Sequence, residues 1–187
     1  MERFAGGEVV TGSAYEAERA AVRARLASTA GLRRIGLGDG VVLVFHTRET
    51  VRAALQELLR AERVTDADRI SAESTGFAEL LGGDHDLVAT LHLDVSDPVA
   101  LADRVAELAG IEEMVWLDVG GDRVPATADP DDAASGAHHL RFRLGPEQRS
   151  RLLAESFATV TVDHPKLRAS VRLTEEQIRA IAADLRR

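Results

Sequence analysis

Two successive strand-helix-strand patterns in the second half of the chain constrain its fold most strongly. Apolar and polar residues alternate over 87–95, as is typical of a half-buried strand, and Pro98 then stands at the first position of a helix. The same pattern follows an insertion, again with a proline, Pro146, at the helix start. The strands are expected at 87–95, 113–119, 138–144 and 158–162. The sequence therefore predicts an α+β fold with a mixed or antiparallel sheet, a ferredoxin-like βαββαβ section at about residues 87–163, and helices packed on one side.

The first half of the chain predicts helices around one hairpin. Ser13 and Glu16 have the spacing of a capping box, which starts a helix at about 14–29. The turn Gly38-Asp39-Gly40 separates two apolar runs and predicts a hairpin, whose second strand is apolar on both faces and should lie centrally. Further helices are expected after Thr47, Thr65 and Thr174.

The chain is expected to form one domain. Residues 1–12 have no periodicity and contain glycines, so we expect a flexible N-terminal arm, followed by a single α+β domain over 13–187. The chain lacks a signal peptide and any apolar stretch near the ~20 residues of a membrane span. We therefore expect a cytoplasmic protein with no membrane partner.

Composition excludes several classes of chemistry. The 187 residues include no cysteine, which excludes disulfides, thiol nucleophiles and Cys-ligated clusters. The 23 Lys and Arg against 31 Asp and Glu give a net charge of −8, which argues against nucleic acid as a partner. No nucleophile elbow, Walker A, His-Glu-x-x-His or EF-hand pattern occurs. We assign no catalytic residue and no cofactor, and the sequence favours a protein that is not an enzyme.

Histidines leave one route to metal chemistry open. His46 ends the central strand, His92 lies on the mixed face of a strand, and His164 follows another strand. If they converged near Glu57 or Glu62, they would form a reasonable His/carboxylate site for Fe, Mn or Zn. The competing interpretation is that they are isolated surface or core polar groups.

Charged residues of the helix after Thr47 have a simpler interpretation. Glu57 and Arg60 are three residues apart and can pair along the helix, which is worth only ~0.2–0.5 kcal/mol. With Glu62 they are equally consistent with a solvated charged face.

Several stretches, taken in order, resemble an uncharacterised bacterial family known only as a domain of unknown function. They include Tyr15, Arg33–Gly38, Val44-Phe45, Gln56–Val64, Ala89–Leu91, Gly110–Glu112, Val115-Trp116, Leu140–Phe142, Pro146–Gln148 and Asp163–Pro165. Members of that family are often encoded beside rubrerythrin and an iron–sulfur protein similar to heterodisulfide reductase subunits. The resemblance implies a setting of peroxide defence or electron transfer.

The sequence also departs from the pattern of that family. It has His46 and Thr47 where relatives tend to carry an acidic residue and Asn, and Ala53 and Ala54 where they carry an aromatic residue and Gln. The stretch around Glu73 differs as well. If these positions line a family site, this chain has lost part of it.

Two functions from different classes follow. The first is an accessory or interaction partner in a bacterial redox or oxidative-stress pathway, without chemistry of its own. The alternative is a metal- or small-ligand-binding protein, and a homodimer built on a sheet edge is a third interpretation. The ligand candidates to test first are the retained polar residues Glu57, Arg60, Glu62, Glu73 and His164.

Overall fold

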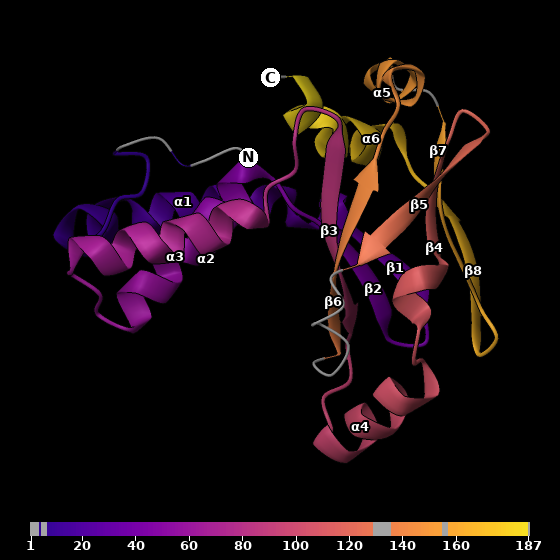
Figure 1. Ribbon diagram of the computed structural model, residues 1–187, viewed down its shortest axis with the longest axis horizontal. Coiled ribbons are helices and arrows are strands. Elements are labelled where there is room, and N and C mark those ends of the chain that lie inside the picture. The colour runs from indigo at the N-terminus through magenta and orange to yellow at the C-terminus, as the bar shows by residue number, and fades with distance from the viewer. Residues whose placement is uncertain (1–3, 5–6, 129–135, 155–156, 187) are drawn as a thin grey trace. The chain divides into compact units, whose positions relative to one another are not determined.

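The computed structural model describes residues 4, 7–128, 136–154 and 157–186 of the chain (Figure 1). These residues form two compact units, one of residues 1–31 and 47–83 and the other of residues 32–46 and 84–187. We call them the helical unit and the barrel unit and describe each by itself. The single domain expected over 13–187 stays a prediction. No helix within the described residues combines the length and the apolar character that crossing a membrane requires.

The barrel unit is built on an eight-stranded antiparallel sheet. Its strands are β1 (Arg34–Gly38), β2 (Val41–Phe45), β3 (Asp86–Leu93), β4 (Val115–Val119), β5 (Asp122–Ala128), β6 (Ala137–Arg143), β7 (Ala158–His164) and β8 (Leu167–Arg172). Their order in the sheet is β1-β2-β3-β6-β5-β4-β7-β8, and β1 lies beside β8. The sheet is therefore nearly closed into a barrel, which leaves few exposed strand edges.

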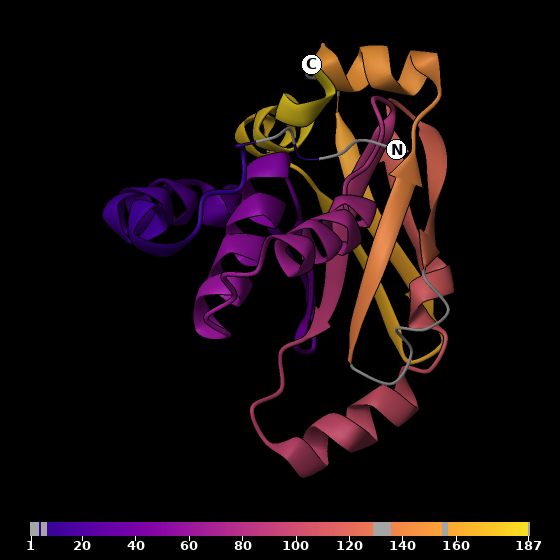
Figure 2. The ribbon, with the colours of Figure 1, turned by 60° about the vertical axis from the view of Figure 1, so that its left-hand side comes forward.

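The inward faces of the strands form the main core. Burial alternates along β4, β6 and β7, so that every second residue points inward. Leu43, Leu91 and Leu117 are fully buried there, and Phe45 packs on Phe142 with ring centroids 5.9 Å apart. Helices cover the two ends of the barrel (Figure 2). One end carries α4 (Pro98–Glu107), and the other carries α5 (Pro146–Leu153), α6 (Glu175–Ile181) and the 3-10 helix η3 (Ala182–Arg186).

The predicted α+β class is confirmed, but the ferredoxin-like section and the helices on one side are not. A ferredoxin-like sheet is made from two βαβ units with parallel central strands. Here β3 pairs antiparallel with β6, and β4 pairs antiparallel with both β5 and β7. The helices α4 and α5 therefore join strands around a barrel and lie at its ends. The strands expected at 87–95, 113–119, 138–144 and 158–162 correspond to β3, β4, β6 and β7, but periodicity did not indicate which strands are neighbours.

The β1–β2 hairpin forms where the sequence predicts it. Asp39 and Gly40 have φ angles of 49° and 74°, so the turn needs residues that tolerate the left-handed region. A Cβ on Gly40 would also lie 3.2 Å from the Asp94 carbonyl oxygen, and the Gly40 carbonyl accepts the Asp94 N–H at 2.6 Å. As expected, β2 is interior to the sheet, between β1 and β3.

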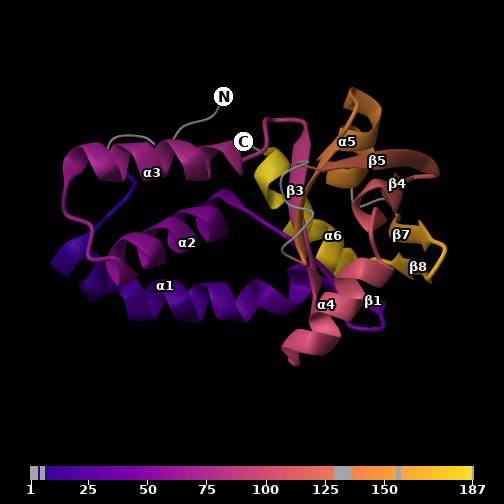
Figure 3. The ribbon, with the colours of Figure 1, turned by 60° about the horizontal axis from the view of Figure 1, so that its bottom comes forward.

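The helical unit consists of α1 (Gly12–Arg33, shared with the start of the barrel unit), α2 (Arg48–Ala61) and α3 (Ala67–Glu79), with α2 lying between the other two (Figure 3). Thr47 starts α2, as predicted, and forms a reciprocal capping box with Thr50, while Asp66 caps α3. The unit has small apolar clusters, one around Val51 and one around Leu55.

The predicted N-terminal arm lies partly outside the described residues, which exclude 1–3 and 5–6. The described part of the arm is attached to α2. Both guanidinium nitrogens Nε and Nη2 of Arg48 lie 2.8 Å from the Glu8 carboxylate, and the buried Gln56 amide donates to the Val10 carbonyl at 2.9 Å. The polar loop expected around residues 128–136 lies outside the description over 129–135.

Candidate functional site in the helical unit

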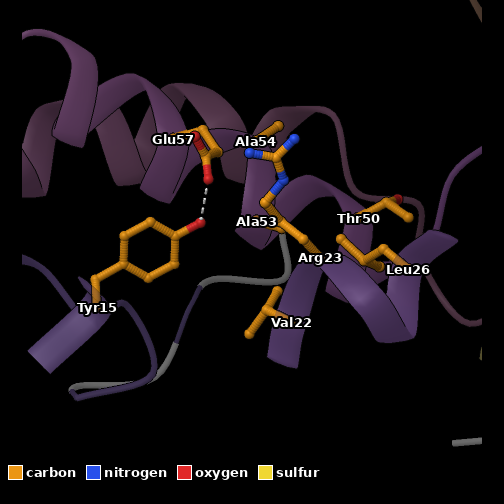
Figure 4. Close-up of a pocket in the computed structure, with 8 residues that line it drawn as sticks. All are labelled: Tyr15, Val22, Arg23, Leu26, Thr50, Ala53, Ala54 and Glu57. Atoms are coloured by element: carbon orange, nitrogen blue, oxygen red, sulfur yellow. Dashed lines mark hydrogen bonds between the residues drawn. The ribbon is translucent and has the colours of Figure 1, made fainter. Parts of the chain in front are cut away.

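A groove of about 320 Å³ lies between α1 and α2 (Figure 4). It is lined by Tyr15, Val22, Arg23 and Leu26 from α1 and by Thr50, Ala53, Ala54 and Glu57 from α2. These positions recur on each helix at intervals of three, four or seven residues, so each helix offers one continuous face. Most of the lining is apolar, and its charged groups are Arg23 and Glu57.

A hydrogen-bonded network closes one side of the groove. The Tyr15 hydroxyl donates to Glu57 Oε1 at 2.8 Å (Figure 4). Arg19 donates to the same carboxylate from Nε at 2.7 Å and from Nη2 at 3.0 Å, a bidentate pair. Tyr15 and Arg19 are four residues apart on α1, so both reach one carboxylate across to α2.

The network fixes the charge of its members. The bonds from Arg19, with a further contribution from Tyr15, lower the pKa of Glu57 from its ordinary 4.5 to about 2. Burial and the bond to Glu57 raise the pKa of Tyr15 to about 12. The same carboxylate raises the pKa of Arg19. At neutral pH the site therefore holds an ionised Glu57, a neutral Tyr15 and a charged Arg19.

The other charged candidates of α2 and α3 do not line the groove. Arg60 does not pair with Glu57 along α2. Its Nε lies 2.5 Å from Glu16 of α1, on the solvent-exposed surface. Glu62 pairs with Arg69 at the start of α3. Glu73 lies half-buried on α3, with no hydrogen bond or ion pair among the described residues.

His46 and His92 lie in the barrel unit and face outward. His46 Nε2 is 2.6 Å from the hydroxyl of the buried Thr90, and His92 alternates along β3 with the inward-facing Leu91 and Leu93. Burial, reinforced by the charges of His139 and His92, lowers the pKa of His46 to about 4. Burial and the charge of Arg34 also lower the pKa of His92. His46 is therefore a neutral ring at neutral pH.

His164 lies on the opposite, inward face of the barrel. It continues the buried row of Val160 and Val162 on β7, and both ring nitrogens contact the backbone. Nδ1 accepts the Lys166 N–H at 3.2 Å, which places the proton of the neutral ring on Nε2, facing the Ala109 carbonyl at 3.3 Å. The strand faces thus separate His164 from His46 and His92. Across residues 4, 7–128, 136–154 and 157–186, no group of three or more His, Asp or Glu could hold a metal ion.

The sequence did not predict that His138 and Glu112 would form a buried polar pair in the barrel unit. His138 points inward from β6 and is 5% exposed, and its Nδ1 lies 3.6 Å from Oε2 of Glu112 on the 3-10 helix η1 (Ile111–Met114). Neither atom has a hydrogen-bond partner within the described residues. The pair is a polar contact inside an otherwise apolar core.

Comparison with known proteins assigns the chain to a family over nearly its full length. The model of a family described as "Protein of unknown function (DUF3501)" matches residues 5–185. The chain belongs to this family. The expected resemblance to an uncharacterised family is thereby confirmed, while the neighbourhood of rubrerythrin and iron–sulfur proteins stays an implication of that resemblance.

A solved structure resembles this DUF3501 chain closely. It is the crystal structure of a novel protein of unknown function from Burkholderia pseudomallei K96243, with a TM-score of 0.90 and 28% sequence identity. The match covers 98% of this chain and 99% of that one. No curated protein matches the chain. The comparisons therefore establish the family and the fold and leave the activity to be argued from the site.

Sequence reasoning named Tyr15 and Glu57 but missed Arg19 and Arg23. The spacing offered a signal, because Arg19 and Arg23 follow Tyr15 at four-residue intervals on one helix. Ala53 and Ala54, two of the departures from the family pattern, line the same groove. What the sequence could not supply is the pairing of Tyr15 with Glu57, 42 residues away.

Proposed function

We propose that this DUF3501 chain is an accessory protein of a bacterial redox or oxidative-stress pathway, acting in the cytoplasm by binding and not by catalysis. The pathway is supported by the family resemblance alone. Binding over catalysis is supported by Glu57, whose pKa of about 2 keeps it ionised and whose carboxylate already accepts bonds from Arg19 and Tyr15. A general acid or base needs a pKa near the working pH. A fixed charge beside a groove is suited to recognition.

A protein of different sequence is the partner that we favour. A homodimer through a sheet edge has less support, because β1 and β8 lie side by side and the barrel offers little free edge. Nucleic acid is disfavoured by the net charge of −8. The absence of cysteine means that any thiol or Cys-ligated cluster belongs to the partner.

Affinity capture under oxidative challenge tests this role. A tagged chain should recover an electron-transfer or peroxide-reducing protein from peroxide-treated cells, and deletion of its gene should raise peroxide sensitivity. A Leu117→Ala chain, destabilised in the barrel core, controls for proteins that bind unfolded chains. Capture of no redox protein, together with unchanged sensitivity of the deletion strain, would overturn the proposal.

We also infer a second function, small-ligand binding, which the groove between α1 and α2 favours. Its volume of about 320 Å³ is at the lower end of the ~300–1,000 Å³ typical of ligand pockets. The metal version of this function, with Fe, Mn or Zn on His46, His92 and His164, has less support, because His164 lies on the other face of the sheet.

Elemental analysis and thermal shift measurements distinguish the metal site on the histidines from the small-ligand site in the groove. Protein purified without chelators should contain metal well below one equivalent, and Fe, Mn or Zn should not raise its melting temperature. A ligand at 100 times its Kd would stabilise the fold by ~2.7 kcal/mol, which such a scan resolves. Stoichiometric metal with a clear shift would instead favour the His/carboxylate site.

A further inference from the structure

The guanidinium of Arg23 stands at the groove without an acidic partner. It is exposed, lines the groove, and makes no hydrogen bond or ion pair within the described residues (Figure 4). Its own helix offers no acid at the neighbouring positions, which are Arg19, Ala20, Leu26 and Ala27. Arg23 therefore presents its donors toward whatever occupies the groove.

Glu57 does not neutralise Arg23 by direct contact. Both of its oxygens already accept hydrogen bonds from Arg19, and Oε1 also accepts the Tyr15 hydroxyl. Arg23 acts on Glu57 only through its charge, which contributes to lowering the Glu57 pKa. Arg19, Arg23 and ionised Glu57 together leave one net positive charge at the site, which favours an anion over a cation.

The remaining lining is apolar and small. Val22 is 6% exposed and Ala53 is 5% exposed, and Leu26 and Ala54 complete the wall. The Thr50 hydroxyl is already used, because it donates to the Thr47 carbonyl at 2.9 Å. A ligand in the groove would thus contact the guanidinium of Arg23 and an apolar surface. A carboxylate matches the guanidinium in a bidentate arrangement, and a hydrocarbon tail matches the wall.

We propose that the groove between α1 and α2 binds a small aliphatic carboxylate, with the carboxylate on Arg23 and the tail against Val22, Leu26 and Ala53. This assignment rests on the small-ligand function proposed above and names its ligand class. The carboxylate replaces water around an exposed guanidinium, so the tail supplies much of the affinity. Binding should therefore need both parts of the ligand.

A titration of the full chain with matched probes tests the assignment. Hexanoate, hexan-1-ol, hexylammonium and inorganic phosphate are added at low salt, and amide shifts of α1 and α2 are followed by NMR. Hexanoate should give saturable shifts around the groove and bind about tenfold or more tightly than hexan-1-ol or hexylammonium. Phosphate, which lacks a tail, should also bind more weakly.

Three variants locate the binding. Arg23→Gln should weaken hexanoate about tenfold or more, because it removes the charge and keeps a polar side chain. Arg52→Gln makes the same charge change on α2 outside the groove lining and should leave binding unchanged. Ala54→Leu, at an exposed helical position, should fill the groove and abolish the shifts. Circular dichroism confirms that each variant is folded.

The outcomes separate the ligand class from the function. Hexanoate binding that survives Arg23→Gln, or phosphate binding as tightly as hexanoate, would overturn the carboxylate assignment. If another probe gives shifts that Ala54→Leu removes, the groove is a ligand site of another class and only the carboxylate is wrong. If no probe shifts the groove, both the assignment and the small-ligand function fall, and the partner role is judged by affinity capture.

Discussion

The barrel unit and the helical unit are held together by different interactions. The barrel has one continuous apolar core, with Leu43, Leu91, Leu117 and Val160 fully buried. The helical unit has small apolar clusters where α2 packs on α3, and ion pairs connect α2 to α1 and to the N-terminal segment. The links are Arg19–Glu57, Arg25–Glu49 and Arg60–Glu16 between α1 and α2, and Arg48–Glu8 from α2 to the N-terminal segment.

Because of this difference, we expect the two units to respond differently to salt. Salt does not screen apolar burial, whereas it weakens exposed ion pairs by screening them. We therefore expect the barrel to keep its structure over a broad range of salt. The helical unit, which holds the groove, should respond to salt. The following substitutions test the comparison, from the largest expected effect to the smallest.

Leu117→Ala should be the most damaging of these changes. The side chain is fully buried in β4, and removing it leaves a cavity in the barrel core, which costs about 2–5 kcal/mol. Denaturant unfolding measures the loss. Val99→Ala, at a position 72% exposed on α4, is the control and should change stability by less than about 0.5 kcal/mol. A loss below about 1 kcal/mol for Leu117→Ala would show that the barrel core is not the main source of stability.

His46 makes one part of the barrel sensitive to acid. Its pKa falls from 6.5 to about 4 on folding, so the unfolded chain binds the proton more readily between these values. The contribution of His46 to the free energy of unfolding should be fully present above pH 6.5. The free energy of unfolding should then fall by ~3 kcal/mol as the pH drops to 4. His46→Gln should flatten this dependence, as measured by urea unfolding at several pH values. The control is His85→Gln, in an exposed turn, which should leave the pH dependence unchanged. If the free energy of unfolding changes equally with pH in both variants, His46 is not the cause of the acid sensitivity.

Tyr15→Phe should loosen the network of the helical unit. It removes the bond to Glu57 and costs about 0.5–1.5 kcal/mol. The Glu57 pKa should rise from about 2, since one of its stabilising donors is lost. The contribution of Glu57, present above pH 4.5 and lost as pH falls toward 2, would then disappear at a higher pH. Carboxyl NMR titration measures the shift. In a Glu57→Gln background the cost of Tyr15→Phe should shrink, and an unchanged cost would exclude the coupling.

Arg60→Gln should have the smallest effect. Its pair with Glu16 is 40% and 51% exposed, and such surface pairs are worth about 0.2–1 kcal/mol. The loss, measured by thermal unfolding, should vanish at 1 M salt. A large, salt-independent loss would mean that Arg60 packs against α1 and does not merely pair with it.

Local signals predicted local structure well. Thr47 and Thr174 are N-caps with reciprocal capping boxes, and the hairpin around Asp39 follows from its turn residues. The order of strands was not predictable in this way, because alternation identifies a strand and not its neighbour. β8 was missed because Arg168, Ser170 and Arg172 alternate with small or half-buried residues, which gives a weak apolar face.

The candidate site was predicted in part for the same reason. Tyr15 and Glu57 were named from sequence, but the contact that makes them a site joins two helices, and it depends on Arg19, which lies among many arginines of this chain. The pairing along α2 that the spacing of Glu57 and Arg60 allows does not form, because both residues pair with side chains of α1. Charge alone could not distinguish a pair along one helix from a pair across two.

The position of β1 beside β8 has a consequence for synthesis on the ribosome. The β1–β2 hairpin ends at Phe45, whereas β8 begins only at Leu167, so β8 is made much later than β1. At ~5–20 residues per second, the outer edge of β1 waits on the order of ten seconds for its neighbour. Until then the nascent chain carries an uncovered strand edge, open to chaperones or to strands of other chains. The synthesis of Leu167–Arg172 thus decides when the edge of β1 is protected from aggregation.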